Sequence, residues 1–321
     1  MSAGTLTYRT EIDWVELEVR TTAPSNFWSV QEVLRPVLPR SQAKQQFVTP
    51  LDGGNGGAAT IFRFSIQDPE RASKIEKVVA ALCGRFDLVS IVVTGVEVAF
   101  DTYSQCGSIR QLAELAADRF RFITAKPSSC WHFYRQRGEN PQFINVLPGR
   151  SDLVEHFEGF WQLADRKDKD TADVRYHAYV KTLDNGTELL PDRHRARFEI
   201  TLRGAALPFQ TVEELKKFNF AELAHYFKFR RIADNVPPAV KYALTSWSGR
   251  QLGLRGPYRR PDLTRVGKYN GTSIFRGSTV ADDKLNADVY ECLRQLTRTW
   301  RKRSRRADFP EVFLPPARMD T

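Results

Sequence analysis

The chain has 321 residues, 41% of them hydrophobic, and a formal net charge of +10. Its length suits one large domain or two smaller ones, and its hydrophobic content is sufficient for a buried core. No apolar run is long enough to span a bilayer, and the first residues lack the layout of a signal peptide, so we expect a cytoplasmic protein without membrane contacts. The basic excess favours a polyanionic partner, and nucleic acid is the usual one.

Several common kinds of site are not indicated by the sequence. The four cysteines are widely spread and form no CxxC pair, which is typical of reduced thiols and argues against a cysteine-based zinc site. The stretch "LDGGNGG" (51–57) is not followed by GK[ST], so it favours a hairpin connection over a phosphate loop. No two histidines lie two residues apart, which argues against a two-histidine metal motif.

The first two-thirds of the chain predicts a mixture of strands and helices. Alternating polar and apolar residues indicate strands, whereas a period near 3.6 indicates helices. Asp68 and Ser108 are suited to cap helices, and Asn185-Gly186 is a turn signal. Residues 1–205 are thus expected to form an α+β domain, with a mostly antiparallel sheet and helices packed on one face. We expect strands at 12–20, 58–66, 87–103, 130–136, 142–147, 174–183 and 195–204, and helices at 25–38, 68–86 and 108–123.

The composition changes after Gly204. A helix is expected at 211–227, and the segment that follows is rich in proline, glycine and arginine. We expect residues 206–321 to form a smaller, basic, mainly helical DNA-binding region, in which Trp300 packs the last helix down. That last helix is expected at 281–306, where the apolar side chains that share one face are Leu285, Val289, Leu293, Leu296 and Trp300.

Basic side chains of this region are expected to contact DNA phosphates. Such contacts give salt-dependent affinity without reading the base sequence. A solvated basic tail is the alternative interpretation. The residues concerned are Arg255, Arg259, Arg260, Arg301, Lys302, Arg303, Arg305 and Arg306.

Carboxylates lie in two of the expected strands. Glu97 and Asp101 in "VEVAFDTY" are four residues apart, so both side chains point to one face of a strand. Buried carboxylates are costly unless they are paired or bound to a cation such as Mg²⁺ or Mn²⁺. The alternatives are that they reach the surface or pair with arginines. In "RARFEITLRG", Glu199 shares a face with Arg195 and Arg197, for which a salt-bridged hairpin is the simpler interpretation.

The strand "VRYHAYVKTL" places two tyrosines on opposite faces. His177, Tyr179 and Lys181 share one face, whereas Tyr176 lies with the aliphatic residues as a core aromatic. A phenol has an unperturbed pKa near 10, so Tyr179 needs nearby cations to act as a nucleophile at neutral pH. A purely structural tyrosine is the alternative.

The order of these motifs resembles the replication initiation factor family, the rolling-circle initiators of small plasmids, filamentous phages and integrative elements. In that family a strand of the form D-hydrophobic-A-x-D precedes R-x-Y-x-K and then R-x-E. The matching stretches here are "EVAFD", "HAYVK" and "ARFEITL", with Glu97 in place of the first aspartate and Tyr179 at the tyrosine position. "IDWVELEV" also resembles the family's first strand, and the resemblance covers residues 10–205.

The resemblance implies origin-specific DNA nicking and strand transfer that initiates rolling-circle replication of a plasmid or phage. Tyr179 would attack a backbone phosphate to form a 5′-phosphotyrosine link and leave a free 3′-OH. Lys181 and His177 would stabilise the phosphate or the phenolate. The implied partner is origin DNA, single-stranded or as a hairpin, with a host helicase and a second copy of the chain as further candidates. The implied ligands of Mg²⁺ or Mn²⁺ are Glu97, Asp101 and Glu199.

A DNA-binding replication or control protein without catalysis is the alternative function. It predicts the same salt-sensitive DNA binding, but indifference to Mn²⁺ and to the substitution Tyr179→Phe. An RNA-binding function is less favoured, because the basic segments contain no RNP-like aromatic motif.

Overall fold

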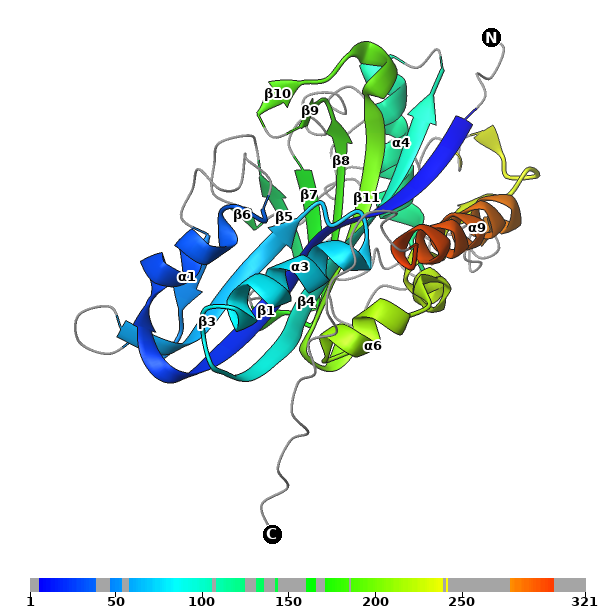
Figure 1. Ribbon diagram of the computed structural model, residues 1–321. Coiled ribbons are helices and arrows are strands. Elements are labelled where there is room, and N and C mark those ends of the chain that lie inside the picture. Colours follow the sequence, from blue (N-terminus) through cyan, green and yellow to red (C-terminus); the bar gives the residue numbers. More distant parts are fainter. Residues whose placement is uncertain are drawn as a thin grey trace.

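The computed structural model describes residues 6–38, 47–53, 58–105, 108–124, 131–135, 142–143, 160–165, 171–184, 186–238, 241 and 278–302. Its centre is a curled nine-stranded sheet of order β2-β3-β1-β4-β11-β8-β7-β5-β6 (Figure 1). All of its strand pairs are antiparallel, which confirms the expected α+β class. The strands are β1 (Leu6–Asn26), β2 (Val48–Pro50), β3 (Ala58–Gln67), β4 (Leu88–Ser104), β5 (Trp131–Arg135), β6 (Gln142–Phe143), β7 (Phe160–Ala164), β8 (Val174–Lys181) and β11 (Arg195–Arg203).

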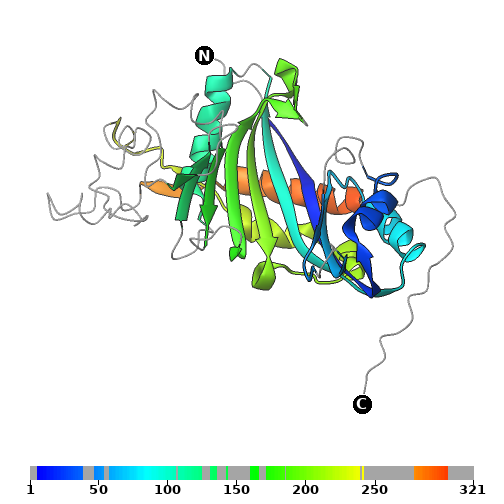
Figure 2. The same ribbon diagram turned by 90° about the vertical axis from the view of Figure 1, so that its left-hand side faces the viewer.

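Helices cover one face of this sheet (Figures 1 and 2). Helix α4 packs on β8 and β11, while α9 packs on β1 and lies beside the 3₁₀ helix η5. In the described part of the chain, no helix is long and apolar enough to cross a membrane. The helices are α1 (Phe27–Leu34), α3 (Ala72–Cys83), α4 (Ile109–Phe122), α6 (Val212–Lys217), η5 (Phe220–Phe227) and α9 (Asp283–Trp300).

The core lies between this face and the helices. Side chains alternate between the two faces of a strand, so every second residue of β4, β8 and β11 enters the core. Tyr176 is fully buried there beside Phe198, as its position among aliphatic residues predicts. Phe198 meets the ring of Phe229 edge-on at a centroid distance of 5.3 Å.

The helices after Gly204 contribute to the same hydrophobic core as the sheet. Trp300 is 1% exposed, and its indole N–H donates to the carbonyl oxygen of Leu215 at 3.0 Å. As expected, Trp300 therefore packs α9 against the rest of the protein, here against α6. The division of the chain at 205/206 stays a prediction.

Two expected helices differ in detail from the structure. The helix expected at 211–227 is divided, because α6 ends at Lys217 and the Asn219 side chain accepts from the Ala221 N–H to begin η5. The helix expected at 68–86 begins only at Ala72. Asp68 does not cap it, since its backbone has a φ of 45° and its N–H donates to the carbonyl of Asp13 at 2.8 Å.

Two of the three register shifts in the β1–β4 pairing turn extra side chains away from the core. The register shifts between Ile12 and Trp14, and again between Glu16 and Leu17 opposite Thr94. An extra residue in one strand of a pair re-aims a side chain locally. The side chain of Asp13 thereby reaches Arg197, and the Thr94 hydroxyl donates to Glu16 at 2.9 Å.

The backbone conformation of Gly204, directly after β11, can be tested by substitution. Its φ is +48°, and a Cβ there would overlap Oδ1 of Asp173. We expect Gly204→Ala to lower the free energy of unfolding by about 1–3 kcal/mol, because the left-handed region strains an L side chain. Urea unfolding measures it. Gly53→Ala is the matched control, since a Cβ at Gly53 meets nothing within 4 Å. Equal midpoints for the two variants would contradict the expectation.

Candidate metal and nucleophile site

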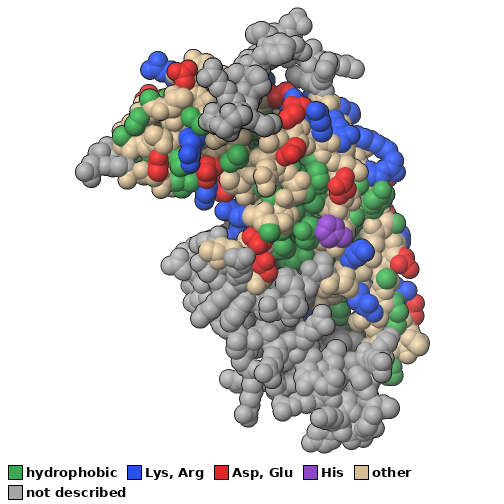
Figure 3. Space-filling model, turned by 90° about the horizontal axis from the view of Figure 1, so that it is seen from below, with side chains coloured by type: hydrophobic (Ala, Val, Ile, Leu, Met, Phe, Trp, Pro, Cys, Tyr) green, Lys and Arg blue, Asp and Glu red, His purple; other side chains and the backbone are tan. Residues whose placement is uncertain are grey.

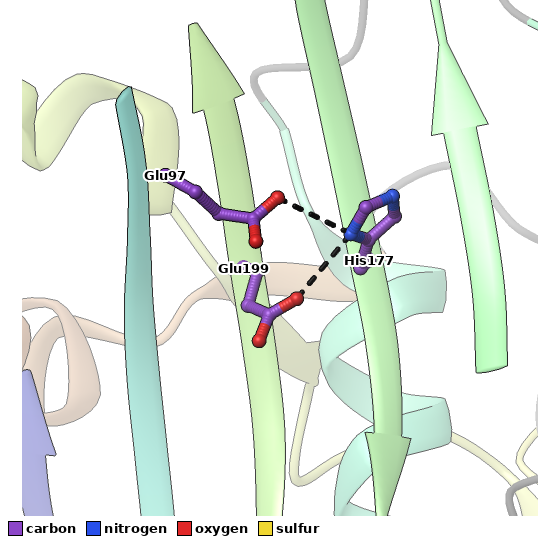
Figure 4. Close-up of side chains that lie close together, drawn as sticks. All are labelled: Glu97, His177 and Glu199. Atoms are coloured by element: carbon purple, nitrogen blue, oxygen red, sulfur yellow. Dashed lines mark hydrogen bonds and ion pairs between the residues drawn. The ribbon is translucent and has the colours of Figure 1, made fainter. Parts of the chain in front are cut away.

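Three ligand-type side chains converge on the sheet face opposite the helices. Glu97 on β4, Glu199 on β11 and His177 on β8 come from three adjacent strands and point toward one another (Figure 4). His177 Nδ1 lies 3.5 Å from Glu97 Oε2 and 3.3 Å from Glu199 Oε2. One possible ligand atom from each residue lies within 4.8 Å of the others. Among the described residues, this is the one group with such spacing.

The spacing and chemistry of these three residues fit a divalent cation. Two ligand atoms about 2.1 Å from an ion, at angles of about 90–110°, lie about 3.0–3.4 Å apart, close to the two observed separations. Two carboxylates with one imidazole form a mixed oxygen and nitrogen set. Imidazole suits transition ions, whereas an all-oxygen set suits Mg²⁺. The donor set therefore fits Mn²⁺ better than Mg²⁺.

The electrostatics of the two glutamates also favour a cation between them. Burial, together with the nearby charges of Glu199 and Asp13, raises the pKa of Glu97 well above its usual range. Burial acts to raise the pKa of Glu199 too, but the hydrogen bond from His177 and the charge of Arg197 bring it to about 2. Two carboxylates that share a buried site need a proton or a cation to offset their repulsion. The Thr201 hydroxyl also donates to Glu97 Oε2 and helps to orient it.

Tyr179 lies directly beside this cluster. Its hydroxyl donates to Glu199 Oε1 at 2.7 Å, so one carboxylate links the phenol to the candidate metal ligands. Burial and the charge of Glu199 raise the pKa of Tyr179 well above its usual range. The Tyr179 phenol therefore keeps its proton and donates a hydrogen bond. A nearby cation is needed to lower its pKa before it can act as a nucleophile.

Asp101 is held by arginines instead of joining the three ligands. Arg197 Nε and Nη2 donate to its two oxygens, each at 2.7 Å, and Arg195 Nε lies 3.0 Å from Oδ2. This is the arginine pairing considered above as an alternative for the acidic strand. Arg197 is fully buried, and its other carboxylate partners are Glu11, Asp13 and Glu199.

Lys181 lies two residues from Tyr179 on the same face of β8. Its ammonium group is 3.0 Å from Asp184 Oδ1, and burial raises the pKa of both Asp13 and Asp68 while the charge of Lys181 partly offsets that rise. Burial and the charge of Glu199 nevertheless raise the pKa of Asp13 to about 7. Lys181 thus adds an ammonium group to a neighbourhood that already holds the Arg197 guanidinium and several carboxylates.

The expected DNA-contacting residues lie far along the chain from this cluster. Arg301 and Lys302 are exposed at the end of α9, where they line a cleft with Lys216 and Lys217 of α6. On the face that Figure 3 shows, basic and acidic side chains of the described residues are interspersed. The remaining expected contacts lie outside the described residues: Arg255, Arg259, Arg260, Arg303, Arg305 and Arg306.

Sequence reasoning missed Asp13 and Gln162, and it assigned His177 to the phosphate instead of to the ligand set. His177 lies directly opposite Glu199 in the β8–β11 register, which the strand spacing alone does not reveal. Gln162 lies opposite His177 on β7 and is 3% exposed, and its Nε2 has no partner among the described residues. A polar residue at a buried strand position is the signal that could have indicated it.

Mn²⁺ is expected to stabilise the protein through these ligands. At 100 times its Kd, a ligand that binds only the folded state adds about 2.7 kcal/mol, which raises Tm by several degrees. A thermal melt with and without Mn²⁺ measures the shift, and Glu97→Gln should largely remove it. Glu213→Gln is the control, because Glu213 is an exposed glutamate of α6. An unchanged shift in Glu97→Gln would exclude this site as the place of binding.

Comparison with known proteins yields one solved structure of note. No family model and no curated protein match the sequence. The chain is similar to the structure of a rolling circle replication initiator protein from Geobacillus stearothermophilus, at 16% sequence identity and a TM-score of 0.33. The match covers 84% of this chain and 98% of the other. We base the proposed function on the site geometry and the motifs, not on this similarity.

Proposed function

We propose that this protein is a metal-dependent DNA nickase and strand transferase that initiates rolling-circle replication, with Tyr179 as its nucleophile. The observation that carries the proposal is the 2.7 Å hydrogen bond from the Tyr179 hydroxyl to Glu199, which is also one of three converging metal-ligand side chains. The phenol and the ion site are therefore neighbours. The motif order that resembles the replication initiation factor family points to the same chemistry.

The reaction is a phosphoryl transfer without net hydrolysis. The Tyr179 oxygen attacks the phosphorus of a DNA backbone phosphate, and the bond from phosphorus to the 3′ oxygen breaks. The products are a 5′-phosphotyrosine link and a 3′-OH, and the phenol proton balances the proton gained by the leaving oxygen. Glu199 is placed to orient the phenol through its hydrogen bond. A divalent ion supplies positive charge that offsets the phosphate charge and lowers the pKa of the phenol.

The residues of this chain divide the other tasks. Glu97, His177 and Glu199 hold the ion, and Arg197 keeps Glu199 and Asp101 in place. The amide N–H of Gln162, which has no partner among the described residues, is a donor for a phosphate oxygen on the same sheet face. Lys181 adds positive charge next to Tyr179.

The cleft lined by Lys216, Lys217, Arg301 and Lys302 at the end of α9 is a second DNA-binding site. Four basic side chains line it, against two acidic ones, Glu76 and Glu213. Because Lys216 and Lys217 are paired with these two carboxylates, the excess positive charge is that of Arg301 and Lys302. Such charge binds phosphates without reading bases, and its contribution falls steeply with salt.

A covalent-adduct assay tests the proposed function. The full chain is mixed with labelled single-stranded DNA from the origin of its own element, with Mn²⁺, Mg²⁺ or EDTA, and run on a denaturing gel. We expect a protein–DNA band with Mn²⁺, a weaker one with Mg²⁺ and none with EDTA. Salt-sensitive DNA binding without a band in any metal would favour the alternative, a DNA-binding protein without catalysis.

A further inference from the structure

A second cleft lies on the same sheet face as the candidate metal site. It has a volume of about 450 Å³, within the usual range for small-ligand pockets. Arg203 lies two residues beyond Thr201 on β11, so it shares the face of Thr201 and Glu199. Gly95, opposite Arg203, lies two residues before Glu97, or about 7 Å along the strand. A nucleotide next to the phosphate that Tyr179 is proposed to attack could therefore reach the cleft.

The charges of this cleft do not suit a phosphate. Arg203 is paired with Glu16 at 3.0 Å, and Arg63 with Glu18 at 2.9 Å. Asp173 adds another carboxylate to the lining. A surface that binds the DNA backbone carries unpaired cations, whereas here guanidinium and carboxylate groups alternate. Such a lining offers hydrogen-bond donors and acceptors together, which suits the edge of a nucleobase.

The donors of the cleft are incompletely used. The Nε atoms of Arg63 and Arg203 are both buried, and neither has a hydrogen-bond partner within the described ranges. The Arg63 and Arg203 side chains are nevertheless 38% and 26% exposed, so other N–H groups of their guanidinium groups can donate to a ligand in the cleft. The carboxylate of Glu16 accepts from Thr94 and Arg203, and it has lone pairs for a further donor.

The guanidinium of Arg203 is also a preformed stacking surface. It lies over the Trp14 ring, 5.2 Å from its centroid. A Cβ on Gly95 would lie 3.0 Å from the Trp14 ring and 3.3 Å from Arg203 Cγ, so a larger residue there would crowd this arrangement. Unpaired bases stack on aromatic rings and on guanidinium planes. Val93 and Leu207 supply apolar walls.

We infer that this cleft binds one unpaired guanine of the DNA beside the cleavage site. Guanine offers O6 and N7 to a guanidinium, the commonest specific contact of arginine with a base. Its N1–H and N2–H groups can donate to a carboxylate such as Glu16. Adenine, cytosine and thymine do not present two adjacent acceptors on one edge and two adjacent donors on the adjoining edge. The inference rests on the proposed action on DNA and adds a base preference to it.

Binding of short oligonucleotides tests this inference without the covalent step. Fluorescence anisotropy of the full-length Tyr179→Phe protein, with EDTA, compares oligo(dT) with the same strand carrying one dG at successive positions. We expect one position at which dG raises affinity about 10–100-fold. Inosine there, which lacks the N2 amino group, should recover only part of the gain.

Substitutions in the cleft should remove the preference without removing DNA binding. Arg203→Lys and Glu16→Gln are expected to bind both strands about as well as the parent binds oligo(dT). Arg294→Lys on the exposed side of α9 is the matched control and should keep the preference. Thermal melts identify any variant that fails to fold. In that case the affinity of the parent protein for the inosine strand tests whether the cleft contacts the N2 amino group of guanine.

The outcomes separate this inference from the proposed function. Covalent adducts without any base preference would overturn the guanine site and leave the nickase intact. A preference for another base, or one that persists in both cleft variants, would also overturn it. A dG preference lost in the cleft variants, from a protein that forms no adduct, would support the guanine site and overturn the nickase.

Discussion

Replacing Tyr179 with phenylalanine is expected to abolish the covalent protein–DNA adduct completely. The substitution removes the single oxygen that attacks phosphorus, and no other step of the proposed reaction can replace it. DNA affinity should change less than about threefold, because the Tyr179 hydroxyl bonds to Glu199 within the protein and the basic side chains proposed to contact DNA phosphates are unchanged. The adduct is measured on a denaturing gel with Mn²⁺, and affinity by anisotropy under the same conditions.

Tyr176 provides the matched control for this experiment. It lies on the same strand but on the opposite face, and it is fully buried against Phe198. Tyr176→Phe should therefore retain the adduct. An adduct that survives Tyr179→Phe would exclude this tyrosine as the nucleophile, and loss in both variants would indicate a folding defect instead.

Replacing Arg197 with methionine is expected to lower the free energy of unfolding by about 3–5 kcal/mol. Arg197 and Asp101 are both fully buried, and the arginine makes two hydrogen bonds of 2.7 Å to that carboxylate. Removing one member of a buried ion pair leaves the other charge without a partner in a poorly solvated place. Here Glu11, Asp13 and Glu199 lose a partner as well. Urea unfolding measures the change.

Two further variants define the origin of that effect. Arg294→Met breaks an exposed pair with Glu291 on α9 and should cost less than about 1 kcal/mol. The double variant Arg197→Met/Asp101→Leu should recover part of the loss, because the unpaired carboxylate is then removed too. If Arg197→Met were as stable as Arg294→Met, the ion pairs of Arg197 would not contribute to the stability of the fold.

The strand periodicity predicted which side chains of the candidate site share a face of the sheet. Alternation along 174–183 separates Tyr179 from the core residue Tyr176, and the structure has the same arrangement. Glu97 and Glu199 are carboxylates at buried strand positions, and both lie in the cluster. Such inferences succeed because the two-residue period is a local property of the backbone.

Contacts between strands could not be predicted in the same way. Asp101 has the spacing of a metal ligand, yet both of its oxygens are held by Arg197. His177 faces Glu199 only because β8 pairs with β11 in a particular register. The bulge at Asp13 inserts a carboxylate into the network that regular alternation does not predict.

The sequence by itself determined the α+β class, the chemical groups available on each strand and the face to which most of them point, because these follow from local periodicity and residue chemistry. The tertiary structure decided which carboxylates meet the imidazole and which meet arginine. It also decided that Arg203 and Glu16 border one cleft and that the Arg203 guanidinium lies over the Trp14 ring. Strand order, register and bulges set those distances, and they depend on packing of the whole sheet against its helices rather than on any single segment.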